Sequence, residues 1–348
     1  MEGLCHPEMK DKERIQLAHG GGGELTAELV EGVILPALGG PQRPGRLTDA
    51  AVIYAGGVKL AFTTDSYVVQ PLEFPGGDIG KLSVVGTIND LSVMGAKPLA
   101  ISLALVIREG LEIALLRSVL ESAGRAAGEA GVSVVTGDTK VVDRDASDGL
   151  VINTTGVGLV GERASLGFDR IRTGDRIILS GPLGEHALAV MSKRRGLSFS
   201  AELVSDCASI AAPAAALLDC LGEDVHFMRD PTRGGLAAVL ADLADATGRN
   251  IEIEEASIPV NRTARAAAEM LGLDLLAAAN EGKLVAVVAA SRAEKAVEVL
   301  AGHAIAAQAA IVGTVGQAGD SPLVEMVTSI GGRRVVQRPY GEELPRIC

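Results

Sequence analysis

The order of apolar and polar positions along the 348 residues predicts strands and helices in alternation. Residues 52–54 and 58–63 are apolar runs that flank a Gly-Gly step, a pattern typical of a β-hairpin. Residues 79–94 carry apolar side chains at helical spacing before Gly95, a common helix stop. The same criteria predict strands at 99–107, 132–136 and 151–160 and a helix at 113–130. Together these elements indicate a β-rich first domain.

A second domain is predicted to begin near residue 176, after a polar, glycine-containing linker at 161–175. Strands and helices are mixed in it, which is typical of α/β layers. After Gly316 the pattern predicts short strands and turns, and residues 338–345 predict a flexible arm before the C-terminus. The expected strands of this domain cover 176–180, 250–253, 284–289 and 310–315, and the expected helices cover 184–192, 209–221, 235–247 and 293–301.

Composition narrows the class of protein. Apolar residues make up 47% of the chain and aromatic residues only 2%, so the core is expected to consist of Val, Leu, Ile and Ala. A formal net charge of −12 argues against general nucleic-acid binding, which needs clustered Lys and Arg. The polar first 14 residues and the short apolar segment 99–107 predict no signal peptide and no membrane span, hence a cytoplasmic protein. The four cysteines form no C-x-x-C pair, so no zinc knuckle or disulfide framework is indicated.

A run of glycines is the first candidate for chemistry. Gly20, Gly21, Gly22 and Gly23 precede a helical pattern that starts at Glu24. Their bare backbone amides could wrap phosphate oxygens at a helix N-terminus, although a glycine run is more often simply a flexible loop. The run matches neither the P-loop nor the dinucleotide fingerprint.

Carboxylates near strand ends are the second candidate. Oxygen ligands that converge there suit Mg²⁺ bridging to phosphates, whereas each aspartate taken singly is also explained as a cap or turn residue. Arg233 and Glu281 lie in turns that could meet an anion or face a crevice between domains. The polar residues selected in this way are Asp49 before one strand, Asp65 after the next, Asn89 and Asp90 in a helix, and Asp138, Thr139 and Lys140 at the end of a strand.

The C-terminus is the third candidate. Cys348 is the last residue, and a thiol on a mobile arm can carry a chemical group between active sites. A chance cysteine at a frayed terminus is the alternative.

Taken together, these motifs resemble the HypE family of hydrogenase maturation proteins, within the ATP-binding aminoimidazole ribonucleotide synthetase-like (PurM-like) superfamily. The resemblance covers nearly the whole chain, and its nucleotide motifs are shared by the superfamily, whereas the ending Pro-Arg-Ile-Cys is particular to this family. The matching segments are residues 19–23, 64–66, 75–80, 89–91, 137–142, 230–236, 280–282 and 345–348.

The resemblance implies a two-domain PurM-like α/β (α+β) fold with an N-terminal β-rich domain that dimerises, a C-terminal α/β domain and a flexible C-terminal tail. The implied divisions are an N-terminal segment with the glycine loop at 1–43, an ATP-binding domain at 44–162, a second domain at 172–320 and a tail at 321–348.

The resemblance also implies an ATP-dependent carbamoyl dehydratase. The carbamoyltransferase HypF would load a carbamoyl group onto Cys348, which this protein would convert into a thiocyanate, and the HypC–HypD complex would receive the cyanide for the iron of [NiFe]-hydrogenase. The catalytic residues that the resemblance implies are Cys348, Lys140 and Glu281, and either of the last two could be the base. The implied Mg²⁺ ligands are Asp65, Asp90 and Asp138. The implied nucleotide-binding residues are Gly20, Gly21, Gly22, Gly23, Asp49, Asp65, Asn89, Asp90, Asp138, Thr139 and Arg233.

Two other functions stay open at this point. A superfamily relative could phosphorylate a small diffusible substrate, in which case Cys348 would be dispensable. A carrier or scaffold could present a modified thiol to partners, and it would then hydrolyse no ATP.

Overall fold

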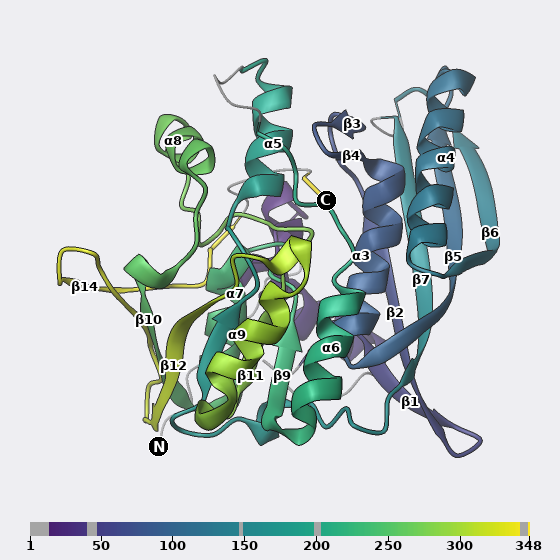
Figure 1. Cartoon of the computed structure of the whole chain (residues 1–348). Helices are drawn as coiled ribbons and strands as arrows, with labels where there is room; N and C mark the ends of the chain where they lie inside the picture. The colour runs from purple at the N-terminus through teal and green to yellow at the C-terminus, as the bar shows by residue number, and fades with distance from the viewer. Residues whose placement is uncertain (1–13, 40–46, 146–148, 198–202, 342–346) are drawn as a thin grey trace.

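A computed structural model describes residues 14–39, 47–145, 149–197, 203–341 and 347–348. Cys5, together with Pro345 and Arg346 of the terminal motif, lies outside the described residues. The described chain forms two mixed α/β parts that lie side by side, with the C-terminus between them (Figure 1).

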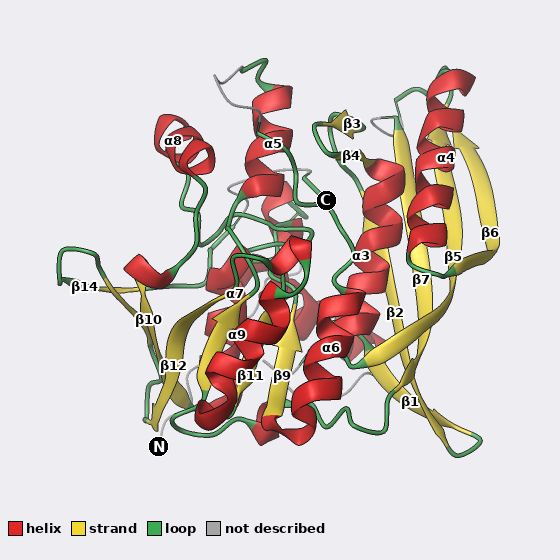
Figure 2. Cartoon of the chain, viewed as in Figure 1, coloured by secondary structure: helices red, strands yellow, loops and turns green. Residues whose placement is uncertain are grey.

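The first part is a five-stranded sheet with the order β1-β2-β7-β5-β6. Its neighbouring strands are antiparallel, except that β5 and β6 run parallel. Helices α3 and α4 pack on one face of it (Figure 2). The bounds are β1 Ala51–Ala55, β2 Val58–Tyr67, β5 Ala96–Arg108, β6 Ser133–Val142, β7 Leu150–Val160, α3 Ile79–Val93 and α4 Ile113–Glu129, with a small hairpin of β3 Glu73–Phe74 and β4 Gly77–Asp78.

Helix α3 is the central element that joins the two parts. Its start is fixed by Asp78, whose carboxylate accepts hydrogen bonds from the Gly80 and Lys81 backbone amides at 2.8 and 3.0 Å. The helix is apolar on nearly all sides because the sheet, α4 and helix α6 (Ala211–Leu221) surround it. Polar groups that α3 carries therefore lie in the interior, between the two parts.

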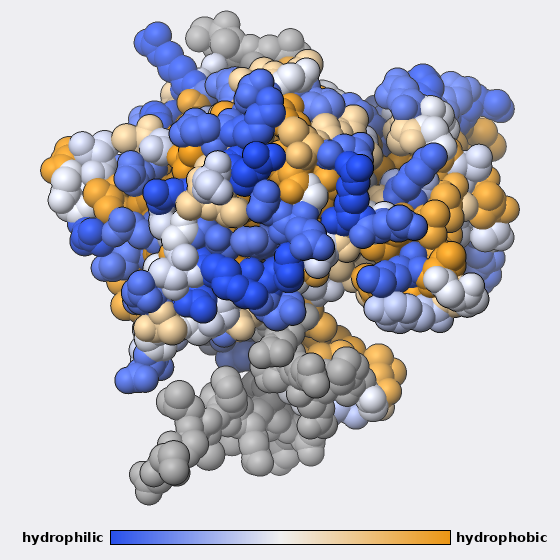
Figure 3. All heavy atoms as spheres, turned by 60° about the horizontal axis from the view of Figure 1, so that its bottom comes forward, coloured by the Kyte–Doolittle hydropathy of each residue, from blue (hydrophilic) through white to orange (hydrophobic). Residues whose placement is uncertain are grey.

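The other face of the five-stranded sheet is open. Every residue of β1, and nearly every residue of β6, is exposed. Hydrophobic side chains stand on these strands and their neighbours, and Figure 3 shows hydrophobic atoms on the surface of the lobe at the right, which holds this sheet. The strand register places the exposed side chains of Ile53, Phe62 and Leu159 on this face. A hydrophobic sheet face of this kind is typical of an interface.

The second part is a seven-stranded sheet with the order β14-β13-β10-β12-β8-β11-β9. Successive residues of β8 alternate between two cores: Ile177 and Leu179 pack with α7 on one face, and Ile178 packs with α6 and α9 on the other. The strands are β8 Arg176–Leu179, β9 Val225–Arg229, β10 Arg249–Glu254, β11 Val285–Val288, β12 Ala310–Ala318, β13 Val324–Val327 and β14 Arg333–Val335. The helices are α5 Glu185–Arg194, α6, α7 Gly235–Thr247, α8 Arg262–Leu271 and α9 Ala293–Ala301.

The N-terminal segment adds two short helices, α1 (Glu24–Leu29) and α2 (Leu35–Leu38). The two-domain α/β fold predicted from the sequence is confirmed, and most predicted elements lie within a few residues of the observed ones. Strand β6 is longer than the predicted 132–136, so the prediction that Asp138 and Lys140 follow a strand is wrong: both lie inside it. Within the described ranges, no helix combines the length and the apolar character needed to cross a membrane.

Candidate active site

The C-terminal residues Ile347 and Cys348, here called the terminal dipeptide, are docked between the two parts of the molecule. The Ile347 side chain is buried among core residues of both parts, including Phe74 and Val190. The backbone amide of Val68 donates to a C-terminal carboxylate oxygen of Cys348 at 3.3 Å. The sequence predicted a mobile, exposed terminus, whereas these two residues are held in the interior because isoleucine finds an apolar pocket there.

Cys348 lines a small pocket whose other walls come from distant parts of the sequence. Asp65 lies near the end of β2, Asp90 on α3, Asp230 and Arg233 in the turn between β9 and α7, and Glu281 in the loop before β11. The pocket is completed by Ser66, Tyr67, Gly86 and Thr232. Five of the residues predicted from the sequence are therefore brought together: Asp65, Asp90, Arg233, Glu281 and Cys348.

Three carboxylates form a cluster beside this pocket. One oxygen each from Asp49, Asp90 and Asp230 lies within 4.8 Å of the others. Asp90 also accepts a hydrogen bond of 2.9 Å from the Thr63 hydroxyl, and Asp49 pairs with Arg229 at 3.1 Å. One Asp230 carboxylate oxygen is buried and has no hydrogen-bond partner among the described residues. Oxygen ligands so arranged fit a divalent cation such as Mg²⁺.

The electrostatics of the cluster also favour a bound divalent cation. Burial raises the pKa of the Asp90 carboxyl well above its ordinary value of 3.8, and the nearby Asp230, Asp65 and Asp49 raise it further. The pKa of Asp230 is raised well above 3.8 by burial and by the same like charges. Closely packed carboxylates with this behaviour repel one another when ionised, and a bound cation would relieve the repulsion.

Glu281 and Arg233 line the pocket beside the thiol. Burial, followed by Asp230, Asp206 and Asp65, raises the pKa of Glu281 well above its ordinary 4.5, and one of its carboxylate oxygens has no hydrogen-bond partner in the described chain. Arg233 lies 3.6 Å from the Asp65 carboxylate. The Tyr67 hydroxyl donates to the other Asp65 oxygen at 3.2 Å, which fixes that carboxylate in the pocket wall.

The glycine loop lies against the turn that carries Arg233. A side chain at Gly22 would come within 2.4 Å of Arg233 Cβ, and one at Gly23 within 2.1 Å of the Pro339 carbonyl oxygen, so the close approach requires glycine. Gly22 also has a φ of +77°, which favours glycine. The next amides, of Glu24 and Leu25, donate to the Pro339 and Tyr340 carbonyls at 2.8 and 3.1 Å. Gly20 and Gly21 lead into this contact from the 3₁₀ turn at Leu17–Gly20.

Asp138, Thr139 and Lys140 are not part of this pocket in the single chain. Asp138 and Lys140 pair with each other at 2.6 Å on the surface. The register Ser66–Asn153–Ala104–Asp138 across the sheet places Asp138 on the open face, and Asp65 points to the helix-covered face. Three strand spacings, about 14 Å, separate β2 from β6. Of the predicted Mg²⁺ set, Asp90 belongs to the observed carboxylate cluster, Asp65 lines the neighbouring pocket, and Asp138 lies apart from both in the single chain.

Asn89 is occupied by contacts between the two parts. Its amide donates to the Ala208 and Glu281 carbonyls at 3.3 and 3.2 Å and accepts from the Ile210 amide at 2.9 Å. These three hydrogen bonds connect α3 to the loop that carries Glu281, so Asn89 orients that loop.

Asp230 is a site residue that the sequence did not predict, although the Asp-Pro step after β9 was a usable signal.

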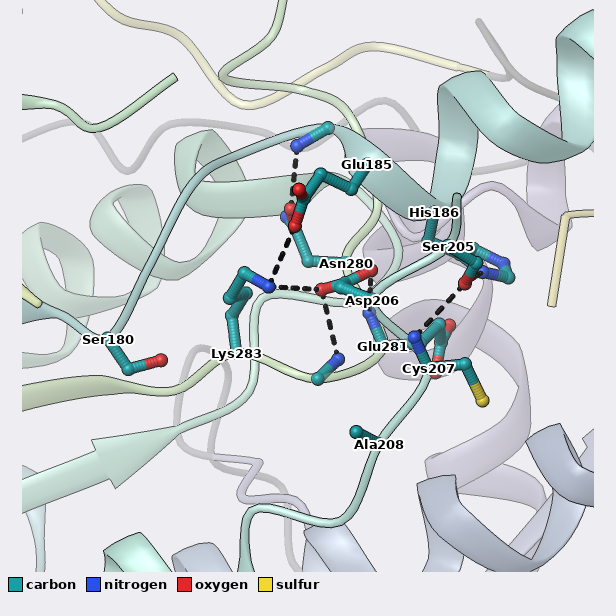
Figure 4. A network of polar contacts seen from close by, with 12 residues as sticks. Ser180, Glu185, His186, Ser205, Asp206, Cys207, Ala208, Asn280, Glu281 and Lys283 are labelled. Atoms are coloured by element: carbon teal, nitrogen blue, oxygen red, sulfur yellow. Dashed lines mark hydrogen bonds and ion pairs between the residues drawn. The ribbon is translucent and has the colours of Figure 1, made fainter. Parts of the chain in front are cut away.

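The sequence also did not predict the buried ion network that lies beneath the pocket and is shown in Figure 4. Lys283 pairs with Glu185 at 3.0 Å and with Asp206 at 3.2 Å. Asp206 also accepts from the Glu281 and Gly282 amides at 3.3 and 3.1 Å. This network fixes the backbone at Glu281.

The docked state controls the reactivity of Cys348. The surrounding protein raises the pKa of its thiol to about 12 from 9.0, mainly by burial and then by Glu281 and Asp65, against the opposing effect of Arg233. Docking therefore favours the neutral thiol, and this contribution is complete below pH 9.0 and lost as the pH rises toward about 12.

We expect a thiol-alkylating reagent at pH 8 to modify Cys348 at least about tenfold more slowly than the exposed Cys220, because the thiolate is the reactive form. The Cys348 rate should rise steeply between pH 9 and 12. Peptide-resolved mass spectrometry measures both sites in one sample, and buried Cys207 serves as the unreactive reference. Equal rates at Cys348 and Cys220 at pH 8 would contradict the docked arrangement.

Comparison with known proteins identifies the family. The sequence matches the AIR synthase related protein N-terminal domain over residues 47–160 and the corresponding C-terminal domain over residues 172–324. It is 45% identical over 334 residues to carbamoyl dehydratase HypE of Bradyrhizobium diazoefficiens, with 96% of each chain covered. It is 41% identical to carbamoyl dehydratase HypE of Escherichia coli, covering 96% of this chain and 99% of that protein. The chain belongs to the HypE family of carbamoyl dehydratases.

Solved structures agree with membership of the HypE family. A HypE–HypF complex superposes with a TM-score of 0.83 at 42% identity, covering 89% of this chain and 99% of that chain. HypE in complex with ATP superposes with a TM-score of 0.81 at 42% identity, covering 95% of this chain and 98% of that chain. A thiamine monophosphate kinase from Aquifex aeolicus has a TM-score of 0.65 at 18% identity and shares the fold alone.

Proposed function

We propose that this protein uses ATP to dehydrate an S-carbamoyl group on its own Cys348 to a thiocyanate, which supplies cyanide for the iron of [NiFe]-hydrogenase. The observation that carries the proposal is the docked Cys348, which faces Asp65, Arg233 and Glu281 beside a carboxylate cluster that fits a metal. A substrate carried on the chain terminus needs such a pocket within reach of that terminus. The solved complex of a relative with ATP supports ATP as the phosphoryl donor.

The chemistry requires the carboxamide oxygen to become a leaving group. Transfer of the terminal phosphoryl group of ATP to that oxygen forms a C–O–P linkage and releases ADP. One N–H proton is lost as the O-phosphorylated isoimidate forms. Loss of the remaining N–H proton and cleavage of the C–O bond then expel phosphate and leave S–C≡N. The carboxamide oxygen leaves in the phosphate and the two N–H hydrogens leave as protons, so the carbamoyl group loses the elements of one water.

Glu281 is the proposed base for the N–H proton. It lines the same pocket as Cys348, and its raised pKa makes it a stronger base than an ordinary glutamate. Arg233 would balance negative charge near the phosphoryl group, and the glycine loop beside it would cover the phosphates. Asp65, held by Tyr67, would fix the position of Arg233.

Asp49, Asp90 and Asp230 are the residues that would hold Mg²⁺. The fit rests on their mutual distances, on the unpartnered oxygen of Asp230 and on the raised pKa values of all three. When bound, Mg²⁺ would neutralise phosphate charge.

Loading of Cys348 is a separate event in this proposal. The docked thiol is neutral and a poor nucleophile, so a carbamoyltransferase would meet the thiol only when the terminal dipeptide leaves the pocket. The solved HypE–HypF complex of a relative supports HypF as that enzyme. HypC–HypD is the proposed acceptor of the cyanide.

A homodimer is part of the proposal. The open hydrophobic face of the five-stranded sheet is suited to pair with a second copy. Asp138, Thr139 and Lys140 lie on β6 of this sheet, so we propose that they act in the dimer.

Intact-protein mass spectrometry of the carbamoylated protein, before and after Mg·ATP, tests the function. We expect the mass of one water to be lost in wild type. We expect Glu281→Gln to bind Mg·ATP but to dehydrate on the order of 100-fold more slowly, because the proton acceptor is gone. Glu298→Gln, an exposed substitution, is the matched control and should behave as wild type. Carbamoylated protein that keeps its mass with Mg·ATP would contradict the proposed reaction.

A further inference from the structure

His186 is a fully buried histidine that the proposed chemistry does not use. It is the second residue of α5, and its ring packs edge-on against Phe74 with centroids 5.3 Å apart. Both ring nitrogens have hydrogen-bond partners. A buried imidazole with two specific partners is held in one orientation, so its partners indicate what it does.

The hydrogen bonds around His186 set which nitrogen carries the proton. The Cys207 backbone amide donates to the Ser205 hydroxyl oxygen at 3.1 Å, and that hydroxyl lies 2.8 Å from His186 Nδ1 (Figure 4). The Ile347 carbonyl oxygen can only accept, so the proton of the neutral ring sits on Nε2, which donates to that oxygen at 2.5 Å. Nδ1 is then unprotonated and accepts from the Ser205 hydroxyl. Burial lowers the pKa of His186, which favours this neutral form.

The Ile347 carbonyl is one of three points at which the terminal dipeptide is held. The second is the Val68 amide, which donates to a terminal carboxylate oxygen of Cys348, and the third is the buried Ile347 side chain. Two backbone hydrogen bonds and one apolar contact define the register of the dipeptide. A slip by one residue would displace the sulfur by about 3.5 Å, which is enough to remove it from the pocket.

We propose that His186, oriented by Ser205, is a positioning residue that recognises the Ile347 carbonyl and so places the Cys348 sulfur in the Asp65–Arg233–Glu281 pocket. His186 touches no reacting atom and acts through the backbone of the dipeptide. The inference rests on the proposed function for its effect on dehydration, whereas its effect on docking stands independently of it.

Two variants of His186 in the full-length protein test the proposal. His186→Leu removes the donor, and His186→Gln keeps an N–H donor on a side chain of similar length. We expect His186→Leu to raise the alkylation rate of Cys348 at pH 8, relative to Cys220, roughly three- to tenfold, the range for one lost hydrogen bond. Single-turnover dehydration should fall by a similar factor, carbamoyl loading should not slow, and His186→Gln should recover most of both losses.

A second pair of variants keeps the proposal testable if His186→Leu does not fold. Ser205→Ala removes the group that orients the ring, and Ile347→Ala removes the apolar contact at the terminus. Each should increase Cys348 alkylation, and together they should add little beyond the larger single effect, because both act on one docking event. His303→Gln, on a partly exposed histidine distant in sequence, is the control and should match wild type.

Wild-type alkylation and dehydration in folded His186→Leu would overturn the proposal, as would a His186→Gln variant no better than His186→Leu. Wild-type Cys348 alkylation in both Ser205→Ala and Ile347→Ala would overturn it as well. If carbamoylated wild type itself fails to lose water, the proposed function fails, and the alkylation contrast still decides the role of His186 in docking.

Discussion

Replacement of Cys348 by serine is expected to abolish carbamoylation of the protein and thiocyanate formation to the detection limit, since the sulfur is the atom that we propose bears the substrate. The fold should persist, because serine keeps the size of the side chain and the Ile347 and Cys348 backbone contacts remain available. Intact mass after incubation with the carbamoyltransferase and its substrates, followed by Mg·ATP, measures both steps. Circular dichroism and thermal melting report the fold.

Cys220→Ser is the matched control for this experiment. Cys220 is exposed and lies on α6, outside the pocket, so its loss should leave loading and dehydration unchanged. Thiocyanate formation by Cys348→Ser would contradict the proposed function outright. ATP turnover on a small diffusible substrate, unchanged by Cys348→Ser, would instead favour the kinase-type alternative. Loading without any ATP-dependent step would favour a carrier.

Substitution of Asp90 or Asp230 by asparagine is expected to lower Mg·ATP-dependent turnover by at least about 100-fold, because each change removes a charged oxygen ligand from the cluster. The double variant should be little worse than either single one, since one missing ligand already disables the site. Steady-state ADP release measures the effect. Asp320→Asn, on an exposed residue, is the control.

The same two variants are expected to be at least as stable as wild type without metal. The pKa values of Asp90 and Asp230 are raised in the folded protein, so their ionised forms destabilise the fold as the pH rises above the ordinary 3.8. Asparagine removes that repulsion. The thermal stabilisation of wild type by Mg²⁺ should accordingly grow with pH and be small in both variants. Full Mg²⁺ stabilisation and turnover in Asp90→Asn and Asp230→Asn would remove these residues from the metal site.

The residues around the pocket show which parts of the site sequence motifs alone can predict. The sequence identified Asp65, Asp90, Arg233, Glu281 and Cys348, which the structure places around one pocket. It grouped Asp138 and Lys140 with them because a strand was predicted to end before these residues. Strand β6 continues through them, and its register turns both side chains to the open face of the sheet.

By itself the sequence determined the order of strands and helices, the helical pattern at residues 79–94 and the candidate thiol at Cys348, because periodicity acts locally. Only the tertiary structure decided that Asp49, Asp90 and Asp230 meet and that Ile347 is buried. The physical reason is that the face to which a strand side chain points depends on the register of that strand. Likewise, Asp90 meets Asp230, 140 positions away, only through packing between distant segments. No local pattern encodes either property.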